Sequence, residues 1–283
     1  MLRTSRRCFG LVGLLTLVSA LQDMDNRPAF AASGKSSSVV YTAHDYGFNG
    51  PEQIPAGVAS LQVVNKGQQP HHAQLLKLLQ GKTAADFRAA IRANPEGFPS
   101  WAKFVGGPNA VLPGGDAVAT MTLTEGNYLL ICLIRDKEGV MHVAHGMVKP
   151  LTVKGVRPTL VSEPKAGLTI TQADFRFDMS SKVMPGTHTI QVLNHGTQTH
   201  EVVVLKLDPG ASAKDFGAAF EPGASGPPPG QPVGGLVGIE TGQHAYFSAH
   251  FEPGRYGLIC FFPDPATGKP HFAQGMTSEF TVE

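Results

Sequence analysis

The sequence predicts an all-β protein made of two tandem β-sandwiches, each with a short helical insertion. Of its 283 residues, 42% are hydrophobic and 16% charged, which is typical of a chain that buries a core. Its 33 glycines and 22 prolines supply the many turns that short strands require. One pattern of residues also occurs twice, about 129 positions apart. The formal net charge of +1 gives no electrostatic footprint for nucleic acid, so we expect no nucleic-acid partner.

Residues 1–31 are predicted to be an export signal that is not part of the fold. The segment 3–7 carries three arginines, 9–21 is an apolar run, and 29–31 resembles a small-residue cleavage site. The arginine pair also resembles a twin-arginine signal, with an ordinary secretory signal as the alternative. No stretch reaches the roughly 18 apolar residues of a membrane span. We therefore expect a periplasmic or otherwise exported protein without a membrane span in its mature chain.

The extent of the repeat predicts the domains. The first domain covers 39–154, a linker covers 155–167, and the second domain covers 168–282. Within them, Leu61–Gly67 matches Ile190–Gly196 almost residue by residue. Two prolines in the linker limit helix formation there.

Each copy is predicted to consist mainly of strands. Leu61 and Val63 alternate with polar neighbours, Met121 and Leu123 do the same, and 202–207 is a largely apolar run. Turns rich in glycine and proline separate these segments. About 115 residues of short strands per copy favour a β-sandwich.

One short helix is predicted in each copy. The capping-box signals are Thr83-x-x-Asp86 and Ser212-x-x-Asp215. The first helix should end near Asn94, before a proline, and the second near Glu221, also before a proline. The segment 221–235 is rich in glycine and proline and is predicted to be a loop.

Five chemically distinctive residues recur at equivalent positions of the two copies. They are Asn65, His71, Cys132, His142 and Met147 in the first copy, and Asn194, His200, Cys260, His271 and Met276 in the second. Two imidazoles, a thiolate and a weak axial thioether form the arrangement that is diagnostic of type 1 copper. The histidines, cysteine and methionine of each copy are therefore the predicted metal ligands, and the chain is predicted to bind up to two coppers.

At these residues the chain resembles the cupredoxin family. The matching motifs are Asn-x-Gly-x-x-x-His, Gly-x-Tyr-x-x-x-Cys and His-x₄-Met, each present twice. The resemblance covers nearly all of the mature chain and implies Greek-key sandwiches with copper near one end. It also implies imidazole nitrogens and a thiolate as strong ligands, an axial methionine, and an asparagine that fastens the cysteine loop. Nine and ten residues separate the cysteines from the next ligand histidines, a loop longer than in small blue copper proteins.

Several other residues are judged separately. Two cysteines in an exported protein normally suggest a disulfide, but Cys132 and Cys260 occupy equivalent positions of separate copies, so none is expected. His72 and His145 do not recur, and are interpreted as surface residues, alternative ligands or proton-sensitive neighbours of the site. Phe272 is interpreted as apolar cover over the copper edge. The remaining unpaired histidines are expected to be surface or core residues: His44, His188, His244 and His250.

The predicted function is electron transfer between copper and a redox partner protein. The alternatives are a module that stores or delivers copper, and a metal-free scaffold that binds proteins. A multicopper reductase or oxidase fits less well, because such enzymes pass electrons through a histidine directly before the cysteine, where this chain has Ile131 and Ile259. The chain also lacks the His-x-His pairs of a trinuclear copper cluster, so we do not expect an enzyme.

Overall fold

The computed structural model describes residues 38–283 except 96, 157–160 and 222. The predicted export signal over 1–31 lies outside these residues. Within the described part of the chain, no helix combines the length and apolar character needed to cross a membrane.

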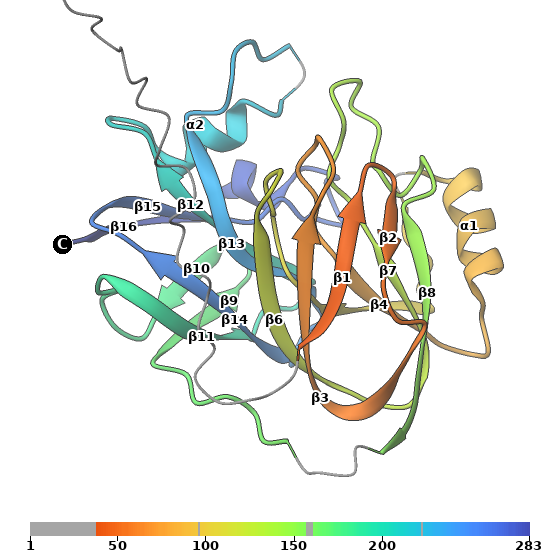
Figure 1. Ribbon diagram of the computed structural model, residues 1–283. Coiled ribbons are helices and arrows are strands. Elements are labelled where there is room, and N and C mark those ends of the chain that lie inside the picture. The colour runs from red at the N-terminus through yellow and green to blue at the C-terminus, as the bar shows by residue number, and fades with distance from the viewer. Residues whose placement is uncertain (1–37, 96, 157–160, 222) are drawn as a thin grey trace, which may run out of the picture. The chain divides into compact units, whose positions relative to one another are not determined.

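Strands make up most of the regular secondary structure of the described residues (Figure 1). The first copy contains β1 (Val39–His44), β2 (Gly47–Asn49), β3 (Gln53–Asn65), β4 (Gln74–Leu78), α1 (Ala84–Ala93), β5 (Ala102–Gly106), β6 (Asp116–Leu123), β7 (Gly126–Ile131) and β8 (Val148–Val156). The second contains β9 (Leu168–Ala173), β10 (Arg176–Met179), β11 (Gly186–Asn194), β12 (His200–Leu207), α2 (Ala213–Ala218), β13 (Gly230–Ile239), β14 (His244–Phe251), β15 (Gly254–Ile259), the 3-10 helix η1 (His271–Gln274) and β16 (Thr277–Val282). The all-β prediction with two tandem sandwiches is confirmed.

The strands form two layers, and each layer continues from one copy into the other. One layer has the order β10-β9-β11-β14-β6-β3-β1-β2. The other has the order β16-β15-β12-β13-β5-β4-β7-β8. The long strand β3 belongs to both layers, because its first residues pair with β8 and its later residues pair with β6 and β1.

The contact between β6 and β14 relates the copies by a local two-fold axis. Ala119 pairs with Phe247, and the flanking pairs are Thr120 with Tyr246 and Val118 with Ser248. Exchanging the copies maps these pairs onto one another, as a two-fold axis through the central pair requires. In the other layer β5 pairs with β13 at Val105 and Ile239. The two copies are thus joined in both layers.

A shared apolar core lies between the layers, with a smaller cluster beside each helix. The core includes Leu61 and Leu130 of the first copy and Val192 and Leu258 of the second, all at most 1% exposed. Phe98 and Trp101 are partly buried and pack against the cluster beside α1. Burial of these side chains supplies the main driving force that holds the ligand-bearing strand ends in place.

Both predicted helices begin at their capping boxes, but one prediction about their ends is wrong. Asn94 caps the end of α1 as expected, whereas α2 ends at Ala218, before the expected Glu221. The glycine at position 217 lowers the helix propensity there. It is required because an added Cβ would lie 2.6 Å from the Phe272 ring.

The loop predicted over 221–235 is also partly wrong, because β13 begins at Gly230. Gly234 and Gly235 have φ values of +130° and +131° within that strand. A Cβ on Gly235 would lie 2.1 Å from the carbonyl oxygen of Val202. The glycines therefore permit a bulged strand with a close backbone approach, in place of a turn.

Candidate metal centres

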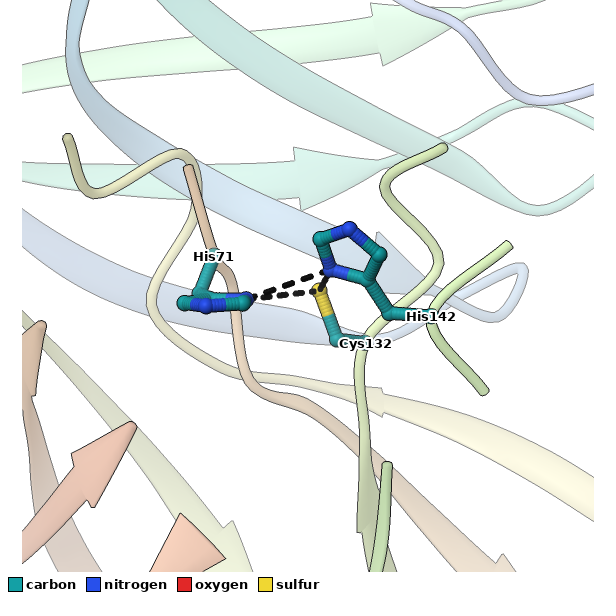
Figure 2. Close-up of side chains that lie close together, drawn as sticks. All are labelled: His71, Cys132 and His142. Atoms are coloured by element: carbon teal, nitrogen blue, oxygen red, sulfur yellow. Dashed lines mark hydrogen bonds between the residues drawn. The ribbon is translucent and has the colours of Figure 1, made fainter. Parts of the chain in front are cut away.

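In the first copy, three predicted ligands converge at one end of the sandwich (Figure 2). His71 follows β3, and its backbone N–H bonds to the Val111 carbonyl oxygen at 3.0 Å. Cys132 directly follows β7, and His142 lies in the loop behind it. The Nδ1 atoms of His71 and His142 are 3.2 Å apart, and Cys132 Sγ lies 3.9 and 3.5 Å from them, respectively.

The second copy repeats this arrangement. His200 is the first residue of β12, Cys260 follows β15, and His271 begins η1. The two Nδ1 atoms are 3.0 Å apart, and Cys260 Sγ is 3.4 Å from that of His271. Within each centre the three donor atoms all lie within 4.8 Å of one another, and all six side chains are 0% exposed. Cys132 and Cys260 are both free thiols.

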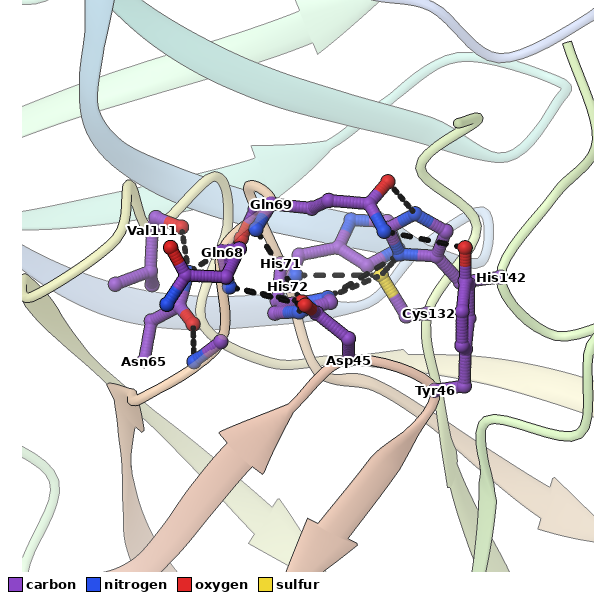
Figure 3. Close-up of polar contacts among 11 residues, drawn as sticks. Asp45, Tyr46, Asn65, Gln68, Gln69, His71, His72, Val111, Cys132 and His142 are labelled. Carbon is purple, nitrogen blue, oxygen red and sulfur yellow. Dashed lines mark hydrogen bonds and ion pairs between the residues drawn. The ribbon is translucent and has the colours of Figure 1, made fainter. Parts of the chain in front are cut away.

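Each ligand ring is oriented by a hydrogen bond on its outer nitrogen (Figure 3). His71 Nε2 lies 3.0 Å from Asp45 Oδ1, and His142 Nε2 lies 3.3 Å from Gln69 Oε1. In the second copy, His200 Nε2 lies 2.9 Å from Asp174 Oδ1, and His271 Nε2 lies 2.8 Å from Gln198 Oε1. The corresponding bonds to the outer ring nitrogens are thus the same in the two copies.

These bonds fix the tautomers of the rings. A carboxylate only accepts hydrogen bonds, so a neutral His71 donates Nε2–H to Asp45 and keeps a lone pair on Nδ1. The amide oxygen of Gln69 requires the same tautomer of His142. Two lone pairs then face each other beside the Cys132 sulfur, and only the thiol proton is available to these three atoms. A bound cation satisfies all of them at once.

The donor set also fits a copper ion in size and chemistry. A metal about 2.0 Å from imidazole nitrogen and about 2.3 Å from thiolate sulfur, as zinc is bound in proteins, places its ligand atoms at separations similar to those found here. Sulfur donors select soft ions such as Cu(I), and imidazole binds copper in both oxidation states. The centres therefore have the size and the donors of copper sites.

Burial keeps the histidines neutral and ready to bind metal. It lowers the pKa of His71 and His200, and lowers the pKa of His142 and His271 to about 4. Burial also raises the pKa of Cys132 to about 12 and raises the pKa of the Cys260 thiol. A buried thiolate thus needs a counter-charge, which a metal ion supplies.

The two predicted methionine ligands lie beside the centres in sequence and are fully buried. Met147 and Met276 are both 0% exposed. The backbone N–H of Met147 donates to the carbonyl oxygen of His142, and that of Met276 donates to the carbonyl oxygen of His271, each at 3.0 Å. The sequence-based assignment of their sulfurs as axial ligands stays a prediction.

The two recurring asparagines have a different role from the one that the resemblance implies. Asn65 Nδ2 donates to the carbonyl oxygens of Gln69 and Val111, and its Oδ1 accepts from Gly67 N–H. Asn194 makes the equivalent three bonds in the second copy. These asparagines close the loop that presents the first histidine, and no bond described for them reaches the cysteine loop.

The structure shows the surroundings of the histidines whose role the sequence left undecided. His72 is buried, and its Nε2 accepts a hydrogen bond from Leu133 N–H at 2.6 Å, so it is neither a surface residue nor available as a ligand through that nitrogen. His145 is exposed and pairs with Asp136 at 2.7 Å. Among the other unpaired histidines, His44, His244 and His250 are exposed and His188 is half-buried.

Phe272 does not cover the copper edge, contrary to expectation. It is 5% exposed and packs in the apolar cluster beside α2, in contact with Phe261. The aromatic rings that contact the second ligand histidines are instead those of Tyr46 and Phe175. The ring centroids of Tyr46 and His142 are 5.4 Å apart, and those of Phe175 and His271 are 5.5 Å apart. Both rings are nearly perpendicular to the imidazole that they contact.

Sequence reasoning missed these flanking aromatic residues and the partners of the outer nitrogens. The missed partners are Asp45 and Gln69, with Asp174 and Gln198 as their equivalents. The signal was present, because each recurs in the second copy at the repeat spacing. An aspartate and a glutamine are ordinary surface residues by type, so only their recurrence marked them.

Comparison with known proteins adds distant similarities. No family model and no curated protein matches the chain. It is similar to dithionite-reduced auracyanin from the photosynthetic bacterium Roseiflexus castenholzii, with 22% identity over 43% of this chain and 99% of that one, and a TM-score of 0.30. It is also similar to a blue copper oxidase from Nitrosomonas europaea, with 14% identity over 86% and 84% of the two chains and a TM-score of 0.26. It is also similar to a copper nitrite reductase from the same organism, with 12% identity over 87% of this chain and 93% of that one, and a TM-score of 0.26.

The strand arrangement shows two tandem β-sandwiches, and each carries one His-Cys-His group, as the resemblance to cupredoxins implies. Their donor sets could hold up to two copper ions, one in each copy.

Proposed function

We propose that the protein is an exported, periplasmic electron carrier with one type 1 copper in each copy. His71, Cys132 and His142 would hold the first ion together with Met147, and His200, Cys260 and His271 would hold the second together with Met276. Bound copper supplies one-electron chemistry by alternating between Cu(I) and Cu(II). The partner would be a redox protein.

One observation carries this proposal. In both copies, two imidazole lone pairs and a buried sulfur converge, and the outer nitrogens of both rings are tied to the fold. Ligands held in this way resist rearrangement when the charge of the ion changes. Fixed ligands suit an electron carrier better than a store, which must release its metal.

The proposal is tested by copper analysis combined with a redox titration of the mature protein. We expect two coppers per chain, an intense thiolate-to-copper absorption band, and reversible loss of the band on one-electron reduction of each centre. Copper that binds without reversible reduction would favour storage or delivery. Absence of copper would favour the scaffold, and more than two coppers per chain would favour an enzyme.

A matched pair of variants assigns the two centres. Cys260→Ala removes the only thiol of the second ligand group and should reduce the copper content from two to one per chain. Cys132→Ala should do the same through the first group. If either variant retains both coppers and the full absorption band, that cysteine is not a ligand.

A further inference from the structure

A short turn in each copy contacts both ligand histidines of that copy. In the first copy, β1 and β2 stay paired up to the turn, so Asp45 and Tyr46 alone connect the two strands. Asp45 Oδ1 accepts from His71 Nε2 at 3.0 Å, and the centroid of the Tyr46 ring lies 5.4 Å from that of His142 (Figure 3). Two consecutive side chains therefore reach the two imidazoles that face each other.

The second copy has the same turn at the repeat spacing. Asp174 and Phe175 connect β9 to β10. Asp174 Oδ1 accepts from His200 Nε2 at 2.9 Å, and the ring centroids of Phe175 and His271 lie 5.5 Å apart. The angle between the aromatic ring and the imidazole is 88° in the first copy and 87° in the second. The two rings are thus nearly perpendicular in both copies.

The backbone of these turns is unfavourable for the aromatic residues that they carry. Tyr46 and Phe175 have φ values of +66° and +65°, in the left-handed region that bulky side chains rarely adopt. Two-residue hairpin turns normally place glycine or asparagine at a positive φ. In the described part of the chain, the other non-glycine residues with a positive φ are Gln80 and Ala110, and neither is aromatic. The turn itself does not favour an aromatic residue here, so the contacts of the ring must favour it.

The contact that the two copies share is the one between the aromatic ring and the second ligand histidine. The Tyr46 ring also lies 4.7 Å from that of His145, but the second copy has Gln274 at that position. The Tyr46 hydroxyl accepts from Gln69 Nε2 at 3.1 Å, but Phe175 has no hydroxyl. Perpendicular packing against the ligand imidazole is present in both copies.

This packing restricts the rotation of the imidazole. A histidine ring has a broad torsional preference about its Cβ–Cγ bond, so its surroundings determine its plane. In the first copy, one hydrogen bond holds the outer edge of the ring, from His142 Nε2 to Gln69 Oε1 at 3.3 Å. The Tyr46 ring adds a favourable aromatic contact and blocks rotation of the imidazole toward it. His142 Nδ1 is thereby held 3.2 Å from His71 Nδ1.

We propose that Tyr46 and Phe175 are positioning residues of the two metal centres, kept at an unfavourable backbone angle because their rings hold the second ligand histidine. The proposal rests on the proposed function, since it concerns the same centres. Each turn acts on both histidines: its carboxylate holds the outer nitrogen of the first, and its aromatic ring holds the plane of the second. Both Nδ1 atoms then face the metal position before a metal arrives.

Three variants separate this role from the needs of the turn. Tyr46→Gly removes the ring and suits a positive φ, so the turn itself should tolerate it. Tyr46→Phe keeps the ring and removes the hydroxyl, as in the second copy. Gln80→Gly is the matched control, because Gln80 is exposed and has a φ of +58° in a turn between β4 and α1. All three are made in the Cys260→Ala background, in which only the first centre is expected to bind copper.

The orientation of His142 is measured in metal-free protein, from the NMR signals of its ring nitrogens and of Nε2–H. Tyr46→Gly should shift these signals and speed the exchange of Nε2–H with water, whereas Tyr46→Phe and Gln80→Gly should leave them close to those of the background protein. In competition with a copper chelator, Tyr46→Gly should bind about tenfold more weakly, as expected for a residue that supports a ligand histidine. The other two variants should keep the affinity of the background protein. Urea unfolding of metal-free Tyr46→Gly should show no loss of stability.

The second copy provides a parallel test. Phe175 is partly buried against the shared core, so Phe175→Leu is used, which keeps the apolar character and removes the flat ring. In the Cys132→Ala background it should shift the ring-nitrogen signals of His271 and weaken copper binding.

The proposal is overturned if Tyr46→Gly leaves the His142 signals unchanged, if Tyr46→Phe weakens binding as much as Tyr46→Gly, or if affinity falls only together with the urea midpoint. The last result would mean that the ring supports the fold in general. A wild-type protein that binds no copper would contradict the proposed function instead. In that case the ring-nitrogen signals of the metal-free variants still decide whether the aromatic rings hold the histidines.

Discussion

The orientation of the ligand side chains is fixed by residues that do not contact the metal position. Asp174 holds the outer nitrogen of His200, and it also accepts from the backbone N–H and the hydroxyl of Thr197. Burial raises the pKa of Asp174, but the bonds from Thr197 and His200 outweigh it and lower the pKa to about 2. The carboxylate is therefore ionised at neutral pH, which fixes the His200 tautomer and raises the basicity of Nδ1.

Removal of this carboxylate should weaken one centre only. In Asp174→Ala, copper affinity at the second centre should fall about 10- to 100-fold, the usual effect of losing a partner of a ligand histidine. Asp174→Asn keeps an acceptor and should recover part of the loss. Competition with a copper chelator measures both affinities, and the first centre is the internal control. Unchanged affinity in Asp174→Ala would show that the hydrogen bond does not support binding.

At this scale the sequence predicted the metal-facing residues better than their supports. Histidine, cysteine and methionine in a fixed order are rare enough to point to copper. Asp45 and Gln69 are as common on surfaces as at sites, and their partners depend on how a loop folds back. Phe272 was misjudged because its neighbour His271 faces the metal position while the phenyl ring packs in the cluster beside α2.

The loops that present the first histidines are the critical elements of the two centres. An asparagine side chain closes each loop through hydrogen bonds. Each loop also contains a glycine that packs against the hydrogen bond between the aspartate and the ligand histidine. A Cβ on Gly196 would lie 2.5 Å from Asp174 Oδ1 and 2.6 Å from His200 Nε2. The glycine is therefore needed for close packing and not for an unusual backbone angle.

Gly196→Ala should disturb the second centre. The added methyl group separates Asp174 from His200, so copper affinity at that centre should decrease toward that of Asp174→Ala. Gly47→Ala is a suitable control, because a Cβ there meets no atom within 4 Å. Chelator competition on both variants checks the prediction. A Gly196→Ala protein with wild-type affinity at both centres would contradict the packing argument.

Elements were predictable where a local signal controls them. Thr83 and Ser212 start their helices as expected, because a capping box acts within one turn. The start of β13 was missed, because glycines that normally mark a loop here permit a close approach to Val202 of a neighbouring strand. Such an approach depends on tertiary structure and has no local signal.

At the scale of the whole molecule, Glu163 in the linker contacts both copies. It accepts hydrogen bonds from Thr122 of β6 at 3.0 Å and from His244 and Tyr246 of β14, each at 2.9 Å. It therefore lies over the junction of β6 with β14. Burial raises its pKa, but these hydrogen bonds outweigh that effect and hold the pKa of Glu163 below its ordinary value of 4.5.

This carboxylate should make the protein less stable in acid. Because its pKa is lower in the folded state, its stabilising contribution is present above about pH 4.5 and is lost as the pH falls through the folded-state pKa. Glu163→Gln should therefore be less stable than wild type at neutral pH, with a difference that shrinks in acid. Urea unfolding of metal-free protein over a pH series measures this, with Glu52→Gln as an exposed control. A difference that does not depend on pH would refute the charge argument.

The repeat predicted the presence of two sandwiches but not how they join. The sequences of β6 and β14 resemble those of any half-buried strand and carry no signal of their partner. Their pairing places residues more than a hundred positions apart side by side. The hydrogen bond from Asn109 to Glu201 was hidden for the same reason. Both features arise only when the copies pack together.

The most direct test of the account is X-ray absorption at the copper edge on protein loaded with two equivalents of copper. The account predicts that each copper is bound by two imidazole nitrogens and one thiolate sulfur, and that Cys132→Ala and Cys260→Ala each lose one such ion. A spectrum without a sulfur ligand, or with copper bound equally well in the double variant, would contradict it.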